Sequence, residues 1–166
     1  MPVEFKDFSF EAKAAINEKT LAWLYETAEE IASQAQRNCQ FDDESGGKQL
    51  KGSYDYQVDE GKGEARIGSP LESAYWEEWG TGEYAHHGDG RKGWWIYIPG
   101  QASMGGGQTY ATKEEAEAMA AFIRAAYNKE AIVTNGRKPN YTLEKAFKKT
   151  KPKAIARLES ILKEME

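Results

Sequence analysis

The sequence predicts an α+β fold, in which a small, mainly antiparallel sheet is packed by a long N-terminal helix, a middle helix and a C-terminal helix. Three patterns lead to this prediction. Apolar residues recur three or four positions apart near both ends of the chain, as on one face of a helix. Between them, residues 50–58 alternate between apolar or aromatic and polar side chains, which is typical of a strand. A turn with two glycines then leads to a second alternating segment.

The first apolar stripe predicts a helix over residues 9–39, with Ser9 as a plausible N-cap. A polar segment with two glycines, residues 42–47, should end this helix. Cys39 is the only cysteine, which excludes an internal disulfide. We expect its thiol to be buried on the apolar face of the helix, because unpaired cysteine behaves as a small apolar residue.

Residues 50–58 and 64–69 are predicted to pair as an antiparallel hairpin around a turn at residues 60–63. Pro70 should then open a short helix over residues 71–79, because proline is tolerated where the first amide of a helix has no partner. On that helix, Trp76 and Trp79 lie three residues apart and would both point toward the sheet. Residues 93–99 predict a strand, between loops at residues 83–92 and 100–108.

In the last third of the chain, Thr112 and Glu115 have the spacing of a capping box and predict the start of another helix. A short strand at residues 131–134 and an Asn-Gly turn should follow. The final helix is predicted over residues 142–166, and Pro152 should kink it or split it in two. We expect residues 1–166 to form a single domain.

The charge of the chain is unevenly distributed. Residues 137–166 contain nine Lys or Arg and four Glu, a net charge of +5, so the other 136 residues carry −10 of the total of −5. A basic contact patch is expected on the last helix, at Lys145, Lys148, Lys149, Lys151, Lys153 and Arg157. Such a run can be a solvated helix face, a contact with an acidic partner ring, or a contact with DNA phosphates.

Few residues have the spacing that catalysis or metal binding needs. The residue types that bind zinc gather at Glu83, His86, His87 and Asp89. However, adjacent histidines point in opposite directions in a strand. Glu77 and Glu78 are adjacent, so on a helix they would not face a common substrate. We therefore predict no catalytic residues, no metal site and no cofactor.

Aromatic residues gather in the middle of the chain, at Trp76, Trp79, Trp94, Trp95, Tyr97 and Tyr110. In the predicted strand, Trp95 and Tyr97 lie on the face opposite Trp94, so one face should be core. The other face can be further core, a subunit interface, or a platform for sugars or bases.

The segment from Ala74 to Gly82 resembles a motif of the HK-ninety-seven gene-product-ten family, which are tail components of long-tailed bacteriophages. That family shows Tyr-Ala-x-Tyr-x-Glu-Phe-Gly-Thr, soon after a strand whose end is similar to residues 66–69. Four positions match and two tryptophans replace other aromatics: Ala74, Glu78, Gly80, Thr81, Trp76 and Trp79. Ser73 stands where tyrosine is usual.

A second segment, residues 139–147, resembles the Pro-x-Pro-Phe-Leu run that enters the last helix of the family. Pro139, Leu143 and the Ala146-Phe147 pair fit this run, whereas Tyr141 and Thr142 depart from it. Residues 83–138 would be an enlarged insertion of loop, strand and helix between the two segments. Interface residues are expected at Trp76, Glu78, Trp79, Gly80, Thr81, Gly82, Trp94, Trp95, Pro139, Tyr141 and Leu143. Glu78 would accept from amides at the exit of the short helix or bind a neighbouring subunit.

The resemblance implies a structural protein of the virion and not an enzyme. It would complete the tail, form a homo-oligomeric ring, as a hexamer in the particle, and join the tail to the DNA-filled head. Its partners would be further copies, head-closure or connector proteins, and the tail tube or tail terminator, with DNA passing through the lumen without specific binding. The chain shows no signal peptide and no membrane span, and should be made in the host cytoplasm. Alternatives are another connector component, or a small metal- or sugar-binding module using residues 83–97.

Overall fold

The computed structural model describes residues 18–40, 47–99 and 107–164. The described residues form five helices and two small antiparallel sheets. Of these residues, 56% are helical and 14% are in strands, which confirms the α+β class. The described residues divide into two compact units. Unit 1 comprises the chain up to Glu78 together with the residues from Tyr141 onward, and unit 2 comprises residues 79–140.

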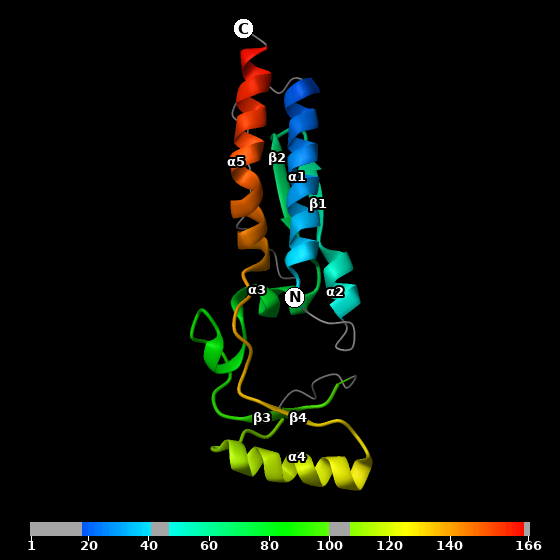
Figure 1. The fold of residues 1–166 in the computed structure, drawn as a ribbon, viewed down its shortest axis with the longest axis vertical. Coiled ribbons are helices and arrows are strands. Elements are labelled where there is room, and N and C mark those ends of the chain that lie inside the picture. The colour runs from blue at the N-terminus through cyan, green and yellow to red at the C-terminus, as the bar shows by residue number, and fades with distance from the viewer. Residues whose placement is uncertain (1–17, 41–46, 100–106, 165–166) are drawn as a thin grey trace. The chain divides into compact units, whose positions relative to one another are not determined.

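Two long helices, α1 (Glu18–Asn38) and α5 (Thr142–Lys163), run antiparallel and side by side in unit 1 (Figure 1). At one end Lys19 Nζ lies 3.2 Å from a carboxylate oxygen of Glu164, and at the other Asn38 Nδ2 donates to the carbonyl of Thr142 at 3.1 Å. The hairpin of β1 (Asp55–Asp59) and β2 (Glu64–Gly68) also contacts α1. It pairs Asp55 with Gly68 and Asp59 with Glu64, as an antiparallel hairpin around residues 60–63 requires.

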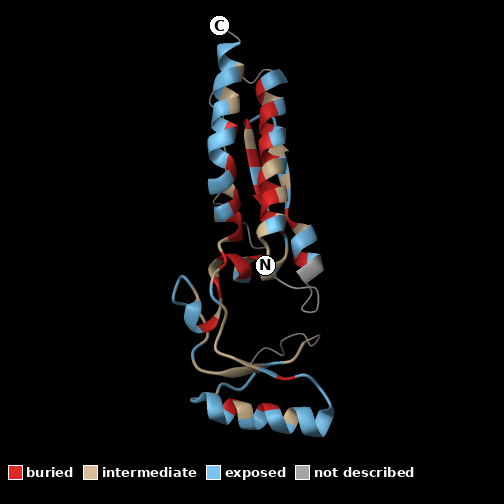
Figure 2. Cartoon of the chain, viewed as in Figure 1, coloured by how far each residue is buried: buried red, intermediate tan, exposed pale blue. Residues whose placement is uncertain are grey.

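The hydrophobic core of unit 1 lies between these elements, and Figure 2 shows the buried residues along the facing sides of α1 and α5. Trp23 is almost fully buried, and its indole N–H donates to the carbonyl of Ala154 on α5 at 2.7 Å. A buried indole needs such an acceptor, because an unsatisfied donor in the core is costly. The main apolar members are Trp23, Leu24, Ala28, Ile31, Ala35, Leu50, Tyr54, Ala65, Ile67, Leu143, Ala146 and Ala154.

The strand predicted from residue 50 is wrong over its first half. Residues Gly47–Ser53 form a helix, α2, and the strand begins only at Asp55. Leu50 and Tyr54 are both buried, and they lie four residues apart. A helix and a strand both place residues that are four positions apart on the same side. Alternation over so short a segment therefore does not distinguish a helix from a strand.

The two long helices depart from their predicted forms in detail. Helix α1 ends at Asn38, and the predicted residues 9–17 lie outside the described residues. Cys39 is half-buried against the core, although we expected a buried thiol. Helix α5 contains Pro152 and is continuous, so the predicted split into two helices is wrong, whereas the alternative, a kink at Pro152, stays a prediction. Pro152 itself is exposed, while Thr150 and Ala154 on either side of it are buried.

The short helix predicted over residues 71–79 is confirmed as α3 (Glu72–Trp79). Unit 2 follows it with a 3₁₀ turn, η1 (Gly82–Tyr84), then β3 (Trp95–Tyr97), α4 (Lys113–Tyr127) and β4 (Ile132–Thr134). Strands β3 and β4 pair antiparallel, separately from β1 and β2, so there are two small sheets where one was expected. The predicted capping box is confirmed: the Glu115 amide donates to the Thr112 hydroxyl, and the Glu115 carboxylate accepts in return.

Unit 2 buries little apolar surface. Among its described residues, the buried apolar side chains are three alanines, Ala116, Ala120 and Ala131. Figure 2 shows α4 mostly exposed. The insertion predicted at residues 83–138 falls within this unit, while the prediction of a single domain stays a prediction.

None of the helices in the described part of the chain is long and apolar enough to span a membrane.

Candidate functional site

Glu78, the acidic residue of the first motif, is buried at the N-terminus of α5. Its two carboxylate oxygens accept hydrogen bonds from the backbone amides of Leu143, at 2.7 Å, and Glu144, at 3.0 Å. The first amides of a helix have no partner within the helix, and they attract negative charge. Tyr141, the N-cap residue, has left-handed backbone angles and gives no side-chain cap. Glu78 therefore caps α5 from another helix.

Glu77 is also buried, and it binds a different part of unit 1. One of its carboxylate oxygens accepts from the Gln40 amide at 2.8 Å and from the Thr142 hydroxyl at 3.3 Å. The two adjacent carboxylates thus hold the end of α1 and the start of α5 in place. They have under 2% of their surface exposed. Neither is positioned to act on a substrate from solution.

Burial changes the ionisation of this cluster. It raises the pKa of Glu78, against the lowering effect of the two amides that donate to its carboxylate. Burial also raises the pKa of the Tyr54 phenol, and the nearby Cys39, Glu77 and Glu78 add to that effect because they disfavour a further negative charge. The cluster is a structural centre of unit 1, since its polar groups face other protein groups.

The end of the first motif bonds, within unit 2, to the residues that lead into the second motif. The Thr81 amide donates to the carbonyl of Arg137 at 2.8 Å, and the Arg137 amide donates to the Thr81 hydroxyl at 3.0 Å. The Glu83 amide donates to the carbonyl of Asn135 at 2.9 Å. In unit 1, the amide of Tyr141 likewise donates to the carbonyl of Glu78 at 3.2 Å. We call these paired segments, residues 78–83 and 135–141, the motif junction.

Glycine is required at the motif junction by close backbone contact. A Cβ at Gly80 would lie 2.7 Å from the carbonyl oxygen of Arg137 and 2.8 Å from the nitrogen of Pro139. Gly80 and Gly82 also have positive φ angles, 75° and 60°. A residue with a side chain would clash with the neighbouring backbone, and it would also disfavour a positive φ angle. Gly80, Gly82 and Pro139 therefore shape the backbone, and the motif they belong to is a structural one.

The sequence did not reveal that the two motifs bond to each other. It marked Thr81 but missed Arg137 as its partner, and it did not reveal that Glu77 binds Gln40 and Thr142. The bond between Thr81 and Arg137 spans 56 residues, which no local pattern encodes.

The aromatic residues do not gather into one site. Trp76 is 41% exposed, so the expectation that it packs on the sheet is wrong. Trp94 and Trp95 are half-buried, beneath the cations of Lys113 and Arg91 at 5.8 Å and 5.0 Å from the ring centroids. Such cation–π contacts are stabilising at the surface as well as in a core.

His86 and His87 lie in a turn and not in a strand, so their rings do not point in opposite directions. The ring centroids are 5.1 Å apart, and both rings contact Trp79, at 5.3 Å and 5.0 Å. The Glu83 carboxylate accepts from the Asn135 side chain instead. Within the described ranges, no group of three or more His, Cys, Asp or Glu side chains is placed to hold a metal ion.

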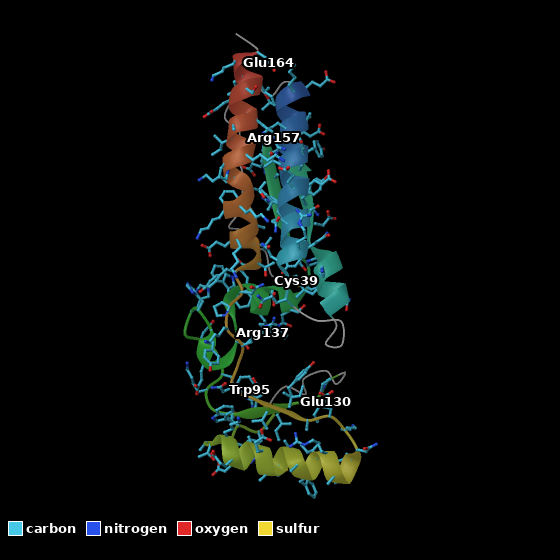
Figure 3. All side chains as sticks on the ribbon, viewed as in Figure 1. Cys39, Trp95, Glu130, Arg137, Arg157 and Glu164 are labelled. Carbon is cyan, nitrogen blue, oxygen red and sulfur yellow. The ribbon has the colours of Figure 1, made fainter. Side chains whose placement is uncertain are left out.

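The predicted basic patch is partly neutralised within unit 1. Arg157, labelled in Figure 3, reaches Glu26 at 3.0 Å and Glu30 at 2.7 Å. Lys153 reaches Glu30 at 2.8 Å. Lys148 pairs with Glu144 on its own helix. Lys145, Lys149 and Lys151 are also exposed on α5, and the Lys151 ammonium lies 5.7 Å from the centroid of the Phe147 ring. Some of the basic residues of α5 therefore form ion pairs with acidic residues of α1, and these pairs join the two helices.

Comparison with known proteins gives no relative: no family model, no curated protein and no solved structure matches this chain.

Proposed function

We propose that this protein is a structural component of a long-tailed bacteriophage that forms a ring in the neck, completes the tail and joins it to the DNA-filled head. The observation that carries the proposal is the surface of unit 2. Six of its large apolar side chains are exposed and others, such as Trp94 and Trp95, are half-buried, while only alanines are fully buried among its described apolar residues. The exposed ones are Tyr84, Tyr97, Met119, Phe122, Tyr127 and Ile132.

A surface of this kind is typical of a protein that assembles. Monomeric proteins usually bury their large apolar side chains, because this burial is the main favourable contribution to the free energy of folding. Unit 2 instead offers aromatic and aliphatic groups on β3, β4 and α4, where a partner would cover them. Tyr and Met are enriched in the centre of protein interfaces.

The motif junction supports the family resemblance in a second way. Glu78 of the first segment accepts hydrogen bonds from the amides of Tyr141, Leu143 and Glu144 in the second segment. Thr81 bonds to Arg137, which lies just before the second segment. Residues that build such a junction can recur as a structural motif in a family of proteins that have no catalytic group in common. The buried Glu78 then has a structural role, as the cap of α5.

The proposed partners are further copies in a hexameric ring, head-closure or connector proteins, and the tail tube or tail terminator. Lys145, Lys149 and Lys151 are exposed cations that suit an acidic neighbouring ring. The acidic remainder of the chain would line the lumen, where like charge lets DNA pass without binding. No cofactor takes part in this function.

The test is to disrupt the gene in a phage that encodes this chain and to examine the lysate by electron microscopy. We expect DNA-filled heads and separate tails, rescued by the wild-type protein. Ile132→Asp should fail to rescue, because it places a charge on the exposed face of β4. Ile155→Asp is the matched control on α5, since the two isoleucines are similarly exposed, at 42% and 38%.

Joined, infectious particles in the absence of the protein would overturn the proposal. Heads that have lost their DNA would instead indicate the head-closure alternative, because that component retains the packaged DNA.

A second candidate is a small-molecule binding module, and the contact of Trp79 with the His86 and His87 rings is the observation that favours it. Exposed aromatic rings can stack on a sugar. Stoichiometric zinc in the purified protein, or saturable quenching of tryptophan fluorescence by a sugar, would support this candidate against the first.

A further inference from the structure

We infer that the exposed face of α4 binds the same face of a second copy of this chain, with the two helices antiparallel. This contact goes beyond the proposed ring, because it is a two-fold contact and does not depend on the phage assignment. The face is defined by Ala118, Met119, Phe122, Ala125 and Ala126, and we call it the α4 face.

The α4 face has the composition of a helix–helix contact. Each of the other four residues lies three or four positions from Phe122, so the five form one stripe along the helix, and all are exposed. Phe122 is 58% exposed, and its ring is held against that of Tyr127, with centroids 6.3 Å apart. The alanines on either side let a second helix approach closely around this aromatic anchor. An unpartnered stripe of this kind favours a helical partner.

The stripe is complementary to itself in one direction. When two copies of α4 cross antiparallel at Phe122, Ala118 of each lies opposite Ala126 of the other, and Met119 lies opposite Ala125. Small residues then meet small residues, and the one long aliphatic side chain meets an alanine. A contact in which one surface patch meets its own copy across a two-fold axis is the commonest form of protein dimer.

Charge selects the same direction. The first turn of α4 carries Lys113, Glu114 and Glu115, a net charge of −1. At the other end, Arg124 lies in the last turn and pairs with Glu117, and Lys129 and Glu130 lie just beyond the helix, a net charge of +1 for Arg124, Lys129 and Glu130. An antiparallel pair brings the acidic end of each helix near the basic end of the other, and it also opposes the two helix dipoles. A parallel pair would instead bring acidic end to acidic end.

A hollow of about 620 Å³ lies beside this stripe. The segment around Tyr110 forms one side, and Glu115, Ala118, Met119 and Phe122 of α4 form the other. An aromatic side chain of the second copy would enter this hollow as the helices meet. The contact is still small, since one helix face buries less than a standard interface of about 800 Å² per partner. We therefore expect a weak dimer.

Sedimentation equilibrium on the full-length protein, over a wide range of concentration, tests the contact. We expect a monomer–dimer equilibrium that Ala118→Arg weakens by about tenfold or more, because a long charged side chain then occupies the place where Ala118 meets Ala126 of the other copy. Ala156→Arg is the matched control: it makes the same change at an exposed alanine of α5, and should leave the equilibrium unchanged.

Cysteine cross-linking tests the direction, in a Cys39→Ala background that removes the native thiol. Under mild oxidation, Met119→Cys and Ala125→Cys should form a mixed disulfide dimer when the two variants are combined, and little dimer when each is alone. Phe122→Cys should cross-link by itself, because the two-fold axis passes beside it.

A wild-type protein that stays monomeric at all concentrations would overturn the inference. So would self-association that Ala118→Arg leaves intact, and that outcome would leave the proposed ring standing on another surface. Cross-linking of Met119→Cys and of Ala125→Cys each to itself would contradict the antiparallel arrangement.

Discussion

A single carboxylate connects two parts of the chain that are 65 residues apart. Glu78 of α3 accepts from the first amides of α5, a role that Ser, Asp or Asn usually has at the N-cap position of the same helix. Tyr141 occupies that position here and makes no side-chain cap. The stability of α5 at this end therefore depends on a residue of another helix.

Replacing Glu78 by alanine should lower the free energy of unfolding by roughly 2–5 kcal/mol, since two buried amides lose their acceptor and a cavity remains. Urea denaturation followed by circular dichroism measures this loss. Glu72→Ala is the control, because Glu72 is exposed on the same helix and should cost less than about 1 kcal/mol. Equal losses from the two variants would exclude the capping role.

The stability of unit 1 depends on pH through both Glu30 and Glu78, and the two contributions have opposite signs. Burial alone would raise the pKa of Glu30, but the hydrogen bonds from Arg157 and Lys153 outweigh it, so the pKa is lowered. A lowered pKa contributes stability above the ordinary value, about 4.3 for glutamate, and this contribution is lost as pH falls through the folded-state pKa. The raised pKa of Glu78 contributes stability at low pH and loses it as pH rises.

Glu30→Gln should therefore destabilise the protein by about 1 kcal/mol at neutral pH, and the difference from wild type should shrink toward zero as pH falls below the ordinary carboxyl range. Thermal unfolding at a series of pH values measures both. Glu29→Gln, an exposed neighbour on α1, serves as the control. A difference that is constant with pH would show that the ion pairs do not stabilise α1 against α5.

At the scale of the elements, the sequence predicts the helices better than the sheets. Long apolar stripes mark α1 and α5, and the Thr112–Glu115 capping box marks the start of α4, because these signals lie within one helix. The apolar pattern of residues 50–54 fits a helix and a strand equally well. The boundary between α2 and β1 therefore depends on how Leu50 and Tyr54 are buried. The pairing of residues 78–83 with 135–141 depends on contacts between distant segments, which local patterns do not contain.

Pro152 is the clearest case of packing that overrides a local signal. It lies inside α5 and is exposed, while Thr150 and Ala154 are buried beside it. Proline removes one backbone hydrogen bond from the helix and crowds the preceding turn. Pro152→Ala should therefore raise the free energy of unfolding by about 1–3 kcal/mol. Lys151→Ala, at the adjacent exposed position, should change it little, and chemical denaturation of both variants checks the difference.

At the scale of the whole molecule, the two units differ in what stabilises them. Unit 1 has a core of large apolar side chains, including Leu24, Ile31 and Leu143, whereas the buried apolar residues described in unit 2 are alanines. Burial of large apolar groups supplies most of the free energy of folding. Unit 1 should therefore fold without unit 2, and unit 2 should need its chain connections or a partner.

Deletion of residues 79–140 tests this difference. The amide of Tyr141 donates to the carbonyl of Glu78, so a linker of a few glycines can replace the whole unit. We expect the shortened chain to be helical and to unfold cooperatively, and isolated residues 79–140 to show no cooperative transition. Ile31→Asp in the shortened chain should abolish folding, since it places a charge in the core of unit 1. A shortened chain that is unfolded would contradict the division.

The distance in sequence between α1 and α5 also affects the time course of synthesis. The bond from Asn38 to Thr142 joins residues 104 positions apart. While the ribosome makes the intervening residues, the apolar stripe of α1 lacks the helix that covers it, and contacts of such separation form slowly. Trp23, whose indole N–H donates to the carbonyl of Ala154 on α5, would stay uncovered until that helix has been made, and exposed apolar surface of this kind favours aggregation of the nascent chain.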